Sequence, residues 1–66
     1  MERYGLLLSN DEGNLRNEYV DADSGGVWFN HKNGVISFKH YEKGEGMKVV
    51  ASFPIRHVQM VWKERN

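Results

Sequence analysis

The chain has no cysteine and only one proline among its 66 residues. Without cysteine it can form neither a disulfide nor a thiolate metal site. A domain this short buries roughly 60% of the surface that its unfolded chain exposes, and small scaffolds usually need disulfides, a metal or a partner subunit. Because disulfides are excluded, we predict that the chain forms a homodimer or a higher homo-oligomer.

Long apolar runs are also absent. The N-terminal region contains only three consecutive leucines, at residues 6–8. This run is too short for the hydrophobic region of a signal peptide or for a membrane span. We therefore expect one domain over residues 1–66, a cytoplasmic location and no membrane partner.

Basic side chains are scarce in residues 1–26 and acidic side chains are scarce in residues 27–66, although the chain as a whole is neutral. Residues 1–26 hold two basic and six acidic side chains, whereas residues 27–66 hold seven basic and three acidic ones. Such asymmetry can mark a surface that binds polyanions. In a neutral chain we favour the alternative, in which the halves neutralise each other within the fold or across a dimer interface.

Residues 27–53 give the clearest structural signal, which is two consecutive β-hairpins. Asn33-Gly34 separates two β-prone runs, and Asn-Gly suits a type I′ turn because both central residues need positive φ. A second turn at residues 42–46 leads into a third run at residues 47–53.

The remaining segments also favour strands. We predict strands at residues 4–9 and 15–20, a loop at 21–26, a break at Pro54, a helical turn at 55–57 and a last strand at 58–63. A helix over residues 1–18 is the alternative, but Gly5, Gly13 and Asn14 would interrupt it. The predicted fold class is all-β, a small twisted antiparallel meander of five to six short strands in a partly open SH3-like or OB-like barrel. This is a likeness of architecture and implies no function.

Strand register divides the hairpins into two faces. A two-residue loop at Asn33-Gly34 pairs Lys32 with Val35 and Phe29 with Phe38. In the second hairpin, the best match pairs Phe38 with Ala51. The face that we predict to be the core then carries Val27, Phe29, Ile36, Phe38, Val49, Ala51 and Phe53.

The opposite face is the candidate working surface. It carries Trp28, Lys39, Tyr41 and Lys48, with Val50 in the same row as Trp28 and Lys39, and with Tyr41 paired to Lys48. Tryptophan and tyrosine anchor protein interfaces. Aromatic rings among lysines also suit single-stranded nucleic acid, because bases stack on the rings and phosphates meet the cations. In a third alternative, residues 1–20 fold over this face and make Trp28 part of the core.

No motif indicates a metal, a cofactor or catalysis. Residues 21–26 are similar to the start of a calcium loop, but Lys32 stands where a bidentate glutamate is required. The three histidines lack the spacing of metal ligands. We expect no cofactor and no enzyme activity. A small nuclease that uses His57 is the third class of function that we consider.

We therefore predict a small non-catalytic binding protein that occludes or bridges a macromolecular partner, as a regulator or inhibitor does. The expected partner is another protein, and the alternative is single-stranded nucleic acid. The predicted binding residues are Trp28, Lys39, Tyr41 and Lys48.

Overall fold

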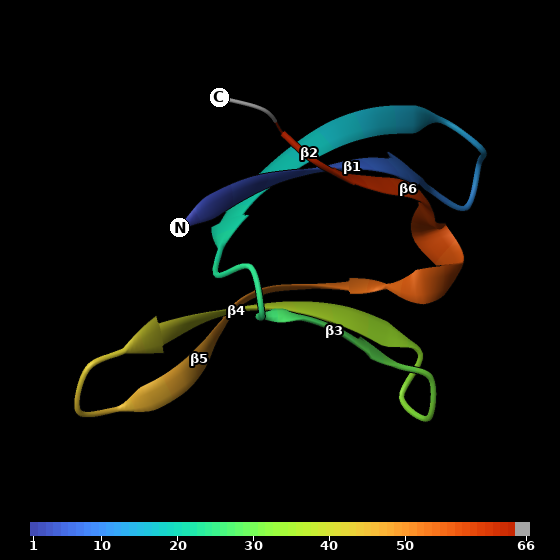
Figure 1. Cartoon of the computed structure of the whole chain (residues 1–66). Helices are drawn as coiled ribbons and strands as arrows, with labels where there is room; N and C mark the ends of the chain where they lie inside the picture. Colours follow the sequence, from blue (N-terminus) through green and yellow to red (C-terminus); the bar gives the residue numbers. More distant parts are fainter. Residues whose placement is uncertain (65–66) are drawn as a thin grey trace.

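The chain folds into two antiparallel sheets that pack face to face in a computed structural model, which describes residues 1–64 (Figure 1). Strands β2, β1 and β6 form the terminal sheet, and β3, β4 and β5 form the central sheet, each in that order. The elements are β1 Glu2–Ser9, β2 Leu15–Ala22, β3 Val27–Asn30, β4 Val35–Glu42, β5 Gly46–Pro54, the 3-10 helix η1 Ile55–His57, and β6 Val58–Lys63.

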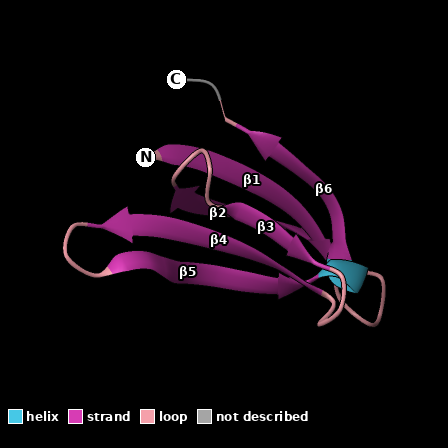
Figure 2. Ribbon diagram, turned by 60° about the horizontal axis from the view of Figure 1, so that its bottom comes forward, coloured by secondary structure: helices cyan, strands magenta, loops and turns pink. Residues whose placement is uncertain are grey.

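The predicted all-β class is confirmed. Strands are present where the alternation of side chains placed them, and the alternative of a helix over residues 1–18 is wrong. The predicted loop at 21–26 is shorter than expected, because β2 continues to Ala22, whose side chain is buried. Figure 2 shows that η1 joins the end of β5 to β6, so the chain passes from one sheet to the other at this turn.

The core lies between the two sheets. Tyr4, Leu6 and Leu8 alternate along β1 toward the central sheet, which presents Ile36 and Phe38 to them. The ring centroid of Phe38 lies 5.7 Å from that of Tyr4 and 6.1 Å from that of Phe53. Burial of each such side chain contributes about 1.5–3 kcal/mol before conformational entropy is subtracted.

The terminal sheet covers the phenylalanine face of the central sheet and leaves the Trp28 face open. The side chain of Trp28 is 56% exposed, so the alternative in which residues 1–20 bury it is wrong. On the covered face, β2 packs across β4 and β5.

The first hairpin has a longer turn than predicted. Asn30 pairs with Val35, so residues 31–34 form the turn, and Phe29 pairs with Ile36 instead of Phe38. The side chain of Asn30 accepts a hydrogen bond from the Asn33 N–H at 3.1 Å. Within residues 31–34, Gly34 alone has positive φ, which rules out a type I′ turn. The pairing shifts by two residues, and an even shift keeps every side chain on its predicted face.

The second hairpin contains a β-bulge that exchanges faces. Phe38 pairs with Ala51 as predicted, but Lys39 then pairs with Val49, which leaves Val50 as the extra residue on β5. The predicted pairing of Tyr41 with Lys48 is therefore wrong, because Tyr41 pairs with Met47 and Lys48 pairs with His40. The bulge places Met47 and Val49 on the open face with Lys39 and Tyr41.

Two residues predicted to be core are exposed. Val49 is turned outward by the bulge. Phe29 lies on the inner side of β3, but it is 55% exposed and stacks on His31, with ring centroids 6.3 Å apart. The terminal sheet packs over β4 and β5, so it does not bury Phe29 at the end of the short edge strand.

We predict that Phe38→Ala lowers the free energy of unfolding by about 3–5 kcal/mol, because it leaves a cavity between the sheets. Phe29→Ala removes the same side chain from an exposed position and should cost less than about 1 kcal/mol. Chemical denaturation of both variants checks this. Equal midpoints would contradict the position of the core.

Candidate interaction surface

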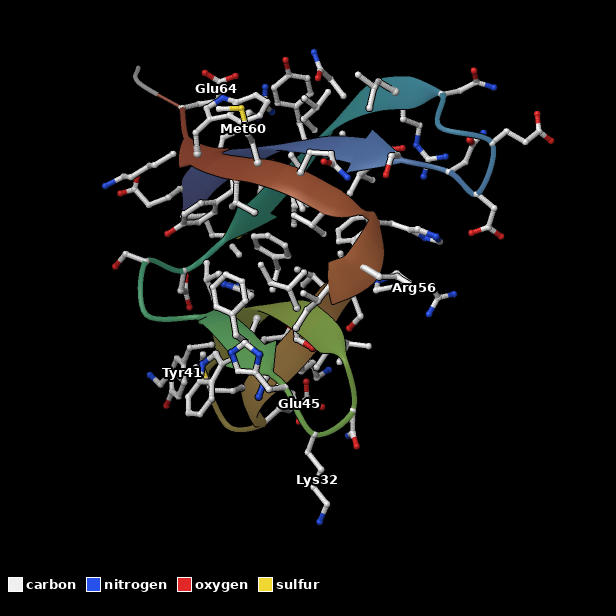
Figure 3. All side chains as sticks on the ribbon, turned by 90° about the vertical axis from the view of Figure 1, so that its right-hand side faces the viewer. Lys32, Tyr41, Glu45, Arg56, Met60 and Glu64 are labelled. Atoms are coloured by element: carbon white, nitrogen blue, oxygen red, sulfur yellow. The ribbon has the colours of Figure 1, made fainter. Side chains whose placement is uncertain are left out.

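The open face of the central sheet carries a strip of side chains that we name the Trp28 surface. It comprises the exposed Trp28 on β3, Tyr41 on β4, and Met47 and Val49 on β5, together with the half-buried Lys39 on β4. Exposed apolar side chains that gather on one face mark interaction sites more often than scattered ones do. In Figure 3, Tyr41 lies on the central sheet and Met60 on the terminal sheet, with Arg56 at the turn between them.

Trp28 is held in place although it is exposed. Its indole Nε1 donates a hydrogen bond to the Gly25 carbonyl at 3.2 Å. The ammonium of Lys39 lies 4.5 Å from the centroid of the indole ring. Such a cation–π contact is worth about 0.5–1 kcal/mol at an exposed site. The ring is therefore pre-organised for contact and loses little conformational entropy on binding.

A close backbone approach joins the loop before Trp28 to β4. The Lys39 N–H donates to the Gly26 carbonyl at 2.8 Å, and the Asp23 N–H donates to the Lys39 carbonyl at 3.0 Å. A Cβ on Gly26 would lie 2.2 Å from the Lys39 carbonyl oxygen, so glycine is required here. These bonds extend the ladder beyond β3 and hold Lys39 beside Trp28.

Asp23 fixes the Tyr41 end of the surface. One carboxylate oxygen accepts a hydrogen bond from the Tyr41 N–H at 2.6 Å, and the other lies 3.2 Å from Nδ1 of His40. The Tyr41 N–H, followed by the His40 ring, holds the pKa of Asp23 below its ordinary value of 3.8. The carboxylate thus accepts the hydrogen bond of a β4 N–H group beyond the point where β3 pairs with β4.

Lys48 lies apart from the other predicted binding residues. The bulge turns it to the His40 side of the hairpin, where its ammonium contacts Glu42 at 2.8 Å and also contacts Glu45. Hydrogen bonds with these carboxylates raise the pKa of Lys48, and the bond with Lys48 lowers the pKa of Glu42. The structure therefore brings together Trp28, Lys39 and Tyr41 and excludes Lys48.

The terminal sheet has an aromatic group on its own outer face that the sequence reasoning missed. Trp62 on β6 lies across Gly5 on β1, where a Cβ would come within 2.3 Å of the indole. Tyr19 on β2 meets the edge of Trp62, with ring centroids 6.4 Å apart. Trp62 is half-buried because it fills the space above a glycine, so its packing accounts for its position. Gly5 pairs with Tyr19 on one side and with Trp62 on the other, and a glycine between two aromatic residues could have indicated this group.

The histidines lie apart and have different neighbours. His31 stacks on Phe29, His40 contacts Asp23, and His57 contacts Asp11 at 2.9 Å. Within residues 1–64, no three His, Cys, Asp or Glu side chains lie close enough together to hold a metal ion. No helix within this part of the chain is long and apolar enough to cross a membrane.

Comparison with protein-family models, with curated proteins and with solved structures finds no match to this chain. The case for a function therefore rests on the geometry of the surface.

The contacts of Asp23 with the Tyr41 N–H and with His40 give a prediction about pH. The pKa of its carboxyl is lower in the folded state, so its contribution to stability is complete only well above the ordinary pKa of 3.8 and is lost as the pH falls toward the lower pKa of the folded state. We expect the difference in unfolding free energy between the unmodified chain and Asp23→Asn to shrink from about pH 5 to about pH 2.5. Urea denaturation across this range measures the difference, and a constant difference would contradict the assignment.

Proposed function

We propose that this chain is a non-catalytic binding protein that holds another protein against the Trp28 surface. The exposed indole of Trp28, fixed at both its N–H and its ring face, is the observation that supports this most strongly. Tryptophan, tyrosine and methionine are enriched in protein interfaces, and rigid aromatic anchors carry much of the binding energy. Covering a partner's own working surface, as a regulator or inhibitor does, requires no chemistry from this chain.

Two features favour a protein over single-stranded nucleic acid. The ammonium of Lys39 occupies one face of the Trp28 ring, so a base would have to displace it to stack there. The second predicted cation, Lys48, is neutralised by Glu42 and Glu45 on the other side of the hairpin. Nucleic acid binders need a groove of several cations along the backbone. The Trp28 surface instead offers one cation among apolar groups, which suits an apolar partner patch with an acidic residue at its edge.

Adjacent aromatic residues on β3 allow a matched test of this surface. Trp28 and Phe29 are 56% and 55% exposed but lie on opposite faces of one strand. With a partner captured by the immobilised chain and identified by mass spectrometry, we expect Trp28→Ala to weaken the purified complex by about 2 kcal/mol, or about 30-fold. Phe29→Ala should leave the affinity within about threefold of the original.

The stability of both variants is measured on the same samples by thermal denaturation. Trp28→Ala loses a hydrogen bond and a cation–π contact, so a small decrease is expected. Equal loss of affinity in the two variants would refute the Trp28 surface.

Two lysines of the central sheet distinguish the two classes of partner. For a protein partner, Lys39→Ala should slow association and reduce its dependence on salt, whereas Lys48→Ala should change neither. For a nucleic acid, both substitutions should reduce the slope of log affinity against log salt concentration by about one each. Surface plasmon resonance at several salt concentrations gives both quantities. Flattening of the slope by Lys48→Ala would favour the nucleic acid alternative.

Self-association is the second part of the proposal. Among residues 1–64 the core contains six buried apolar side chains, and the Trp28 surface leaves further apolar area open to a second copy. We predict a native mass at least twice that of the monomer at micromolar concentration. Sedimentation that shows only a stable monomer across this range would remove the homo-oligomer and leave the partner-binding proposal standing.

A further inference from the structure

β2 is an edge strand of the terminal sheet, and it lacks most of the features that keep an edge from pairing with another chain (Figure 2). Short length, lysine, proline and bulges usually protect such edges. Of the other edges, β3 has four residues, β5 contains the bulge, Lys48 and Pro54, and β6 pairs irregularly with β1 and carries Lys63. β2 has eight residues in unbroken register with β1 and contains neither lysine nor proline.

The main-chain groups of alternate residues on β2 point away from β1. Opposite residues of an antiparallel pair alternate between positions that exchange hydrogen bonds and positions that do not. The Asn10 N–H donates to the Asn14 carbonyl at 3.0 Å, and on the other side of β1 the Glu64 N–H donates to the Arg3 carbonyl at 2.8 Å. Even-numbered residues of β1 therefore bond to β2, which leaves the N–H and C=O groups of residues 15, 17, 19 and 21 directed outward. Within residues 1–64, no main-chain hydrogen bond from another segment reaches these groups.

The central sheet leaves room beside this edge. Arg16 and Glu18 lie on the inner side of β2, since they pair with the buried Leu8 and Leu6. Their side chains are nevertheless 65% and 43% exposed, so the central sheet does not cover this part of the strand. A second strand can therefore approach β2 in the plane of the terminal sheet.

The sequence of β2 is complementary to itself in one antiparallel register. With a two-fold axis at Asn17, this residue faces its own copy, Arg16 faces Glu18, and Leu15 faces Tyr19. Arg16 already contacts Glu18 of its own strand through Nε at 3.1 Å, and its other N–H donors are left for the second copy. Leu15 and Tyr19 lie on the outer side of β2 and are 61% and 51% exposed, so their contact would remove apolar surface from water.

Neighbouring registers lack this match. An axis at residue 16 or at residue 18 sets two arginines or two glutamates opposite each other. An axis at Tyr19 sets Arg16 opposite Ala22 and Glu18 opposite Val20. An axis between two residues sets outward-directed main-chain groups against groups that already bond to β1, so no ladder forms. The register about Asn17 is therefore the favoured one.

We propose that a second copy of this chain pairs with the free edge of β2, in antiparallel register about Asn17, and joins two three-stranded sheets into one of six strands. Arg16 and Glu18 select this occupant. Inward-pointing charges deter an unrelated apolar strand, whereas a second copy supplies the opposite charge at each of them. The inference rests on the self-association proposed above, and it gives the second copy a site apart from the Trp28 surface.

Pairing at β2 leaves both Trp28 surfaces free. The two-fold axis of an antiparallel strand pair is perpendicular to the sheet, so the inner faces of the two terminal sheets remain on one side of the dimer. Each central sheet lies on that side, with its open face turned away from the terminal sheet. The two Trp28 surfaces then point in the same direction, and the dimer binds a partner that carries two sites more tightly than one copy does.

Charge reversal at the paired positions tests the proposal by sedimentation equilibrium. Arg16→Glu sets a glutamate opposite Glu18 of the second copy, and Glu18→Arg sets an arginine opposite Arg16. We expect each variant alone to dimerise about tenfold more weakly than the unmodified chain. An equimolar mixture of the two variants should recover the mass of the dimer, because every pair across the axis then joins opposite charges. Recovery also shows that both variants are folded.

The ion pair of Arg3 with Asp21 provides matched controls. Its distance from Nε to the carboxylate is also 3.1 Å, and its side chains are 59% and 53% exposed. Both residues lie beyond the paired positions 15–19. Arg3→Glu and Asp21→Arg should therefore each change the dissociation constant of the dimer less than about twofold.

Proline substitutions test the main-chain bonds of the edge. Asn17→Pro removes an N–H that is directed outward, and edge strands tolerate proline at such positions. We expect this variant to be monomeric with a circular dichroism spectrum close to that of the unmodified chain. Glu18→Pro removes an N–H directed at β1 and should unfold the chain. Dimerisation of a folded Asn17→Pro variant would overturn the proposal.

The Trp28→Ala variant separates this site from the Trp28 surface, and it should leave the mass of the dimer unchanged. A dimer that Trp28→Ala breaks and Arg16→Glu does not would assign self-association to the Trp28 surface and overturn pairing at β2. A mixture of the reversed variants that stays monomeric would overturn it too. So would a monomeric unmodified chain, and release of a captured protein by Asn17→Pro would then assign the edge to a strand of that protein. The affinities of Trp28→Ala and Phe29→Ala test the partner-binding surface independently.

Discussion

Phe38 is the residue through which the two sheets are joined. Its ring contacts Tyr4 from the terminal sheet and Phe53 from its own sheet, and it is fully buried. Each sheet has only three strands, and a sheet of this size is stable only when one face is covered. By covering the phenylalanine face, the terminal sheet leaves the opposite face of the central sheet open. The exposure of Trp28 and Tyr41, with the half-buried Lys39 between them, therefore follows from the way in which the core closes.

Short polar contacts then determine which side chains share the open face. Asp23 and Gly26 hold β4 where β3 is missing, and the Lys48 ion pairs lie on the other side of the hairpin. The charge asymmetry of the sequence is partly resolved in the same way. Glu2 with Lys63 joins the acidic and basic halves, and Asp23 and Asp11 contact His40 and His57 of the other half, whereas Arg3 with Asp21 and Lys48 with Glu42 stay within one half.

Side-chain alternation was sufficient to predict the strands, the buried Phe38 and the open-face positions of Trp28, Lys39 and Tyr41. It was insufficient for the registers. The first turn is longer than predicted and is held by the Asn30 side chain. The second hairpin contains an extra residue at Val50, and no local sequence pattern indicates this bulge. The strand partners of β1 could not be predicted from the sequence either. The alternation of Tyr4, Leu6 and Leu8 indicates a strand, but its pairing with β6 joins residues that are fifty or more positions apart. The exposure of Phe29 depends on that long-range packing.

The bulge at Val50 determines which side chains of the hairpin tip share the open face. A register without the bulge would bring Lys48 beside Tyr41 and turn Met47 and Val49 inward. In the bulged register Lys48 is paired with Glu42 and Glu45. In evolution, loss of these two glutamates would remove support for that register. The open face would then gain Lys48 as a second cation and lose Met47 and Val49, without any substitution in the Trp28 surface.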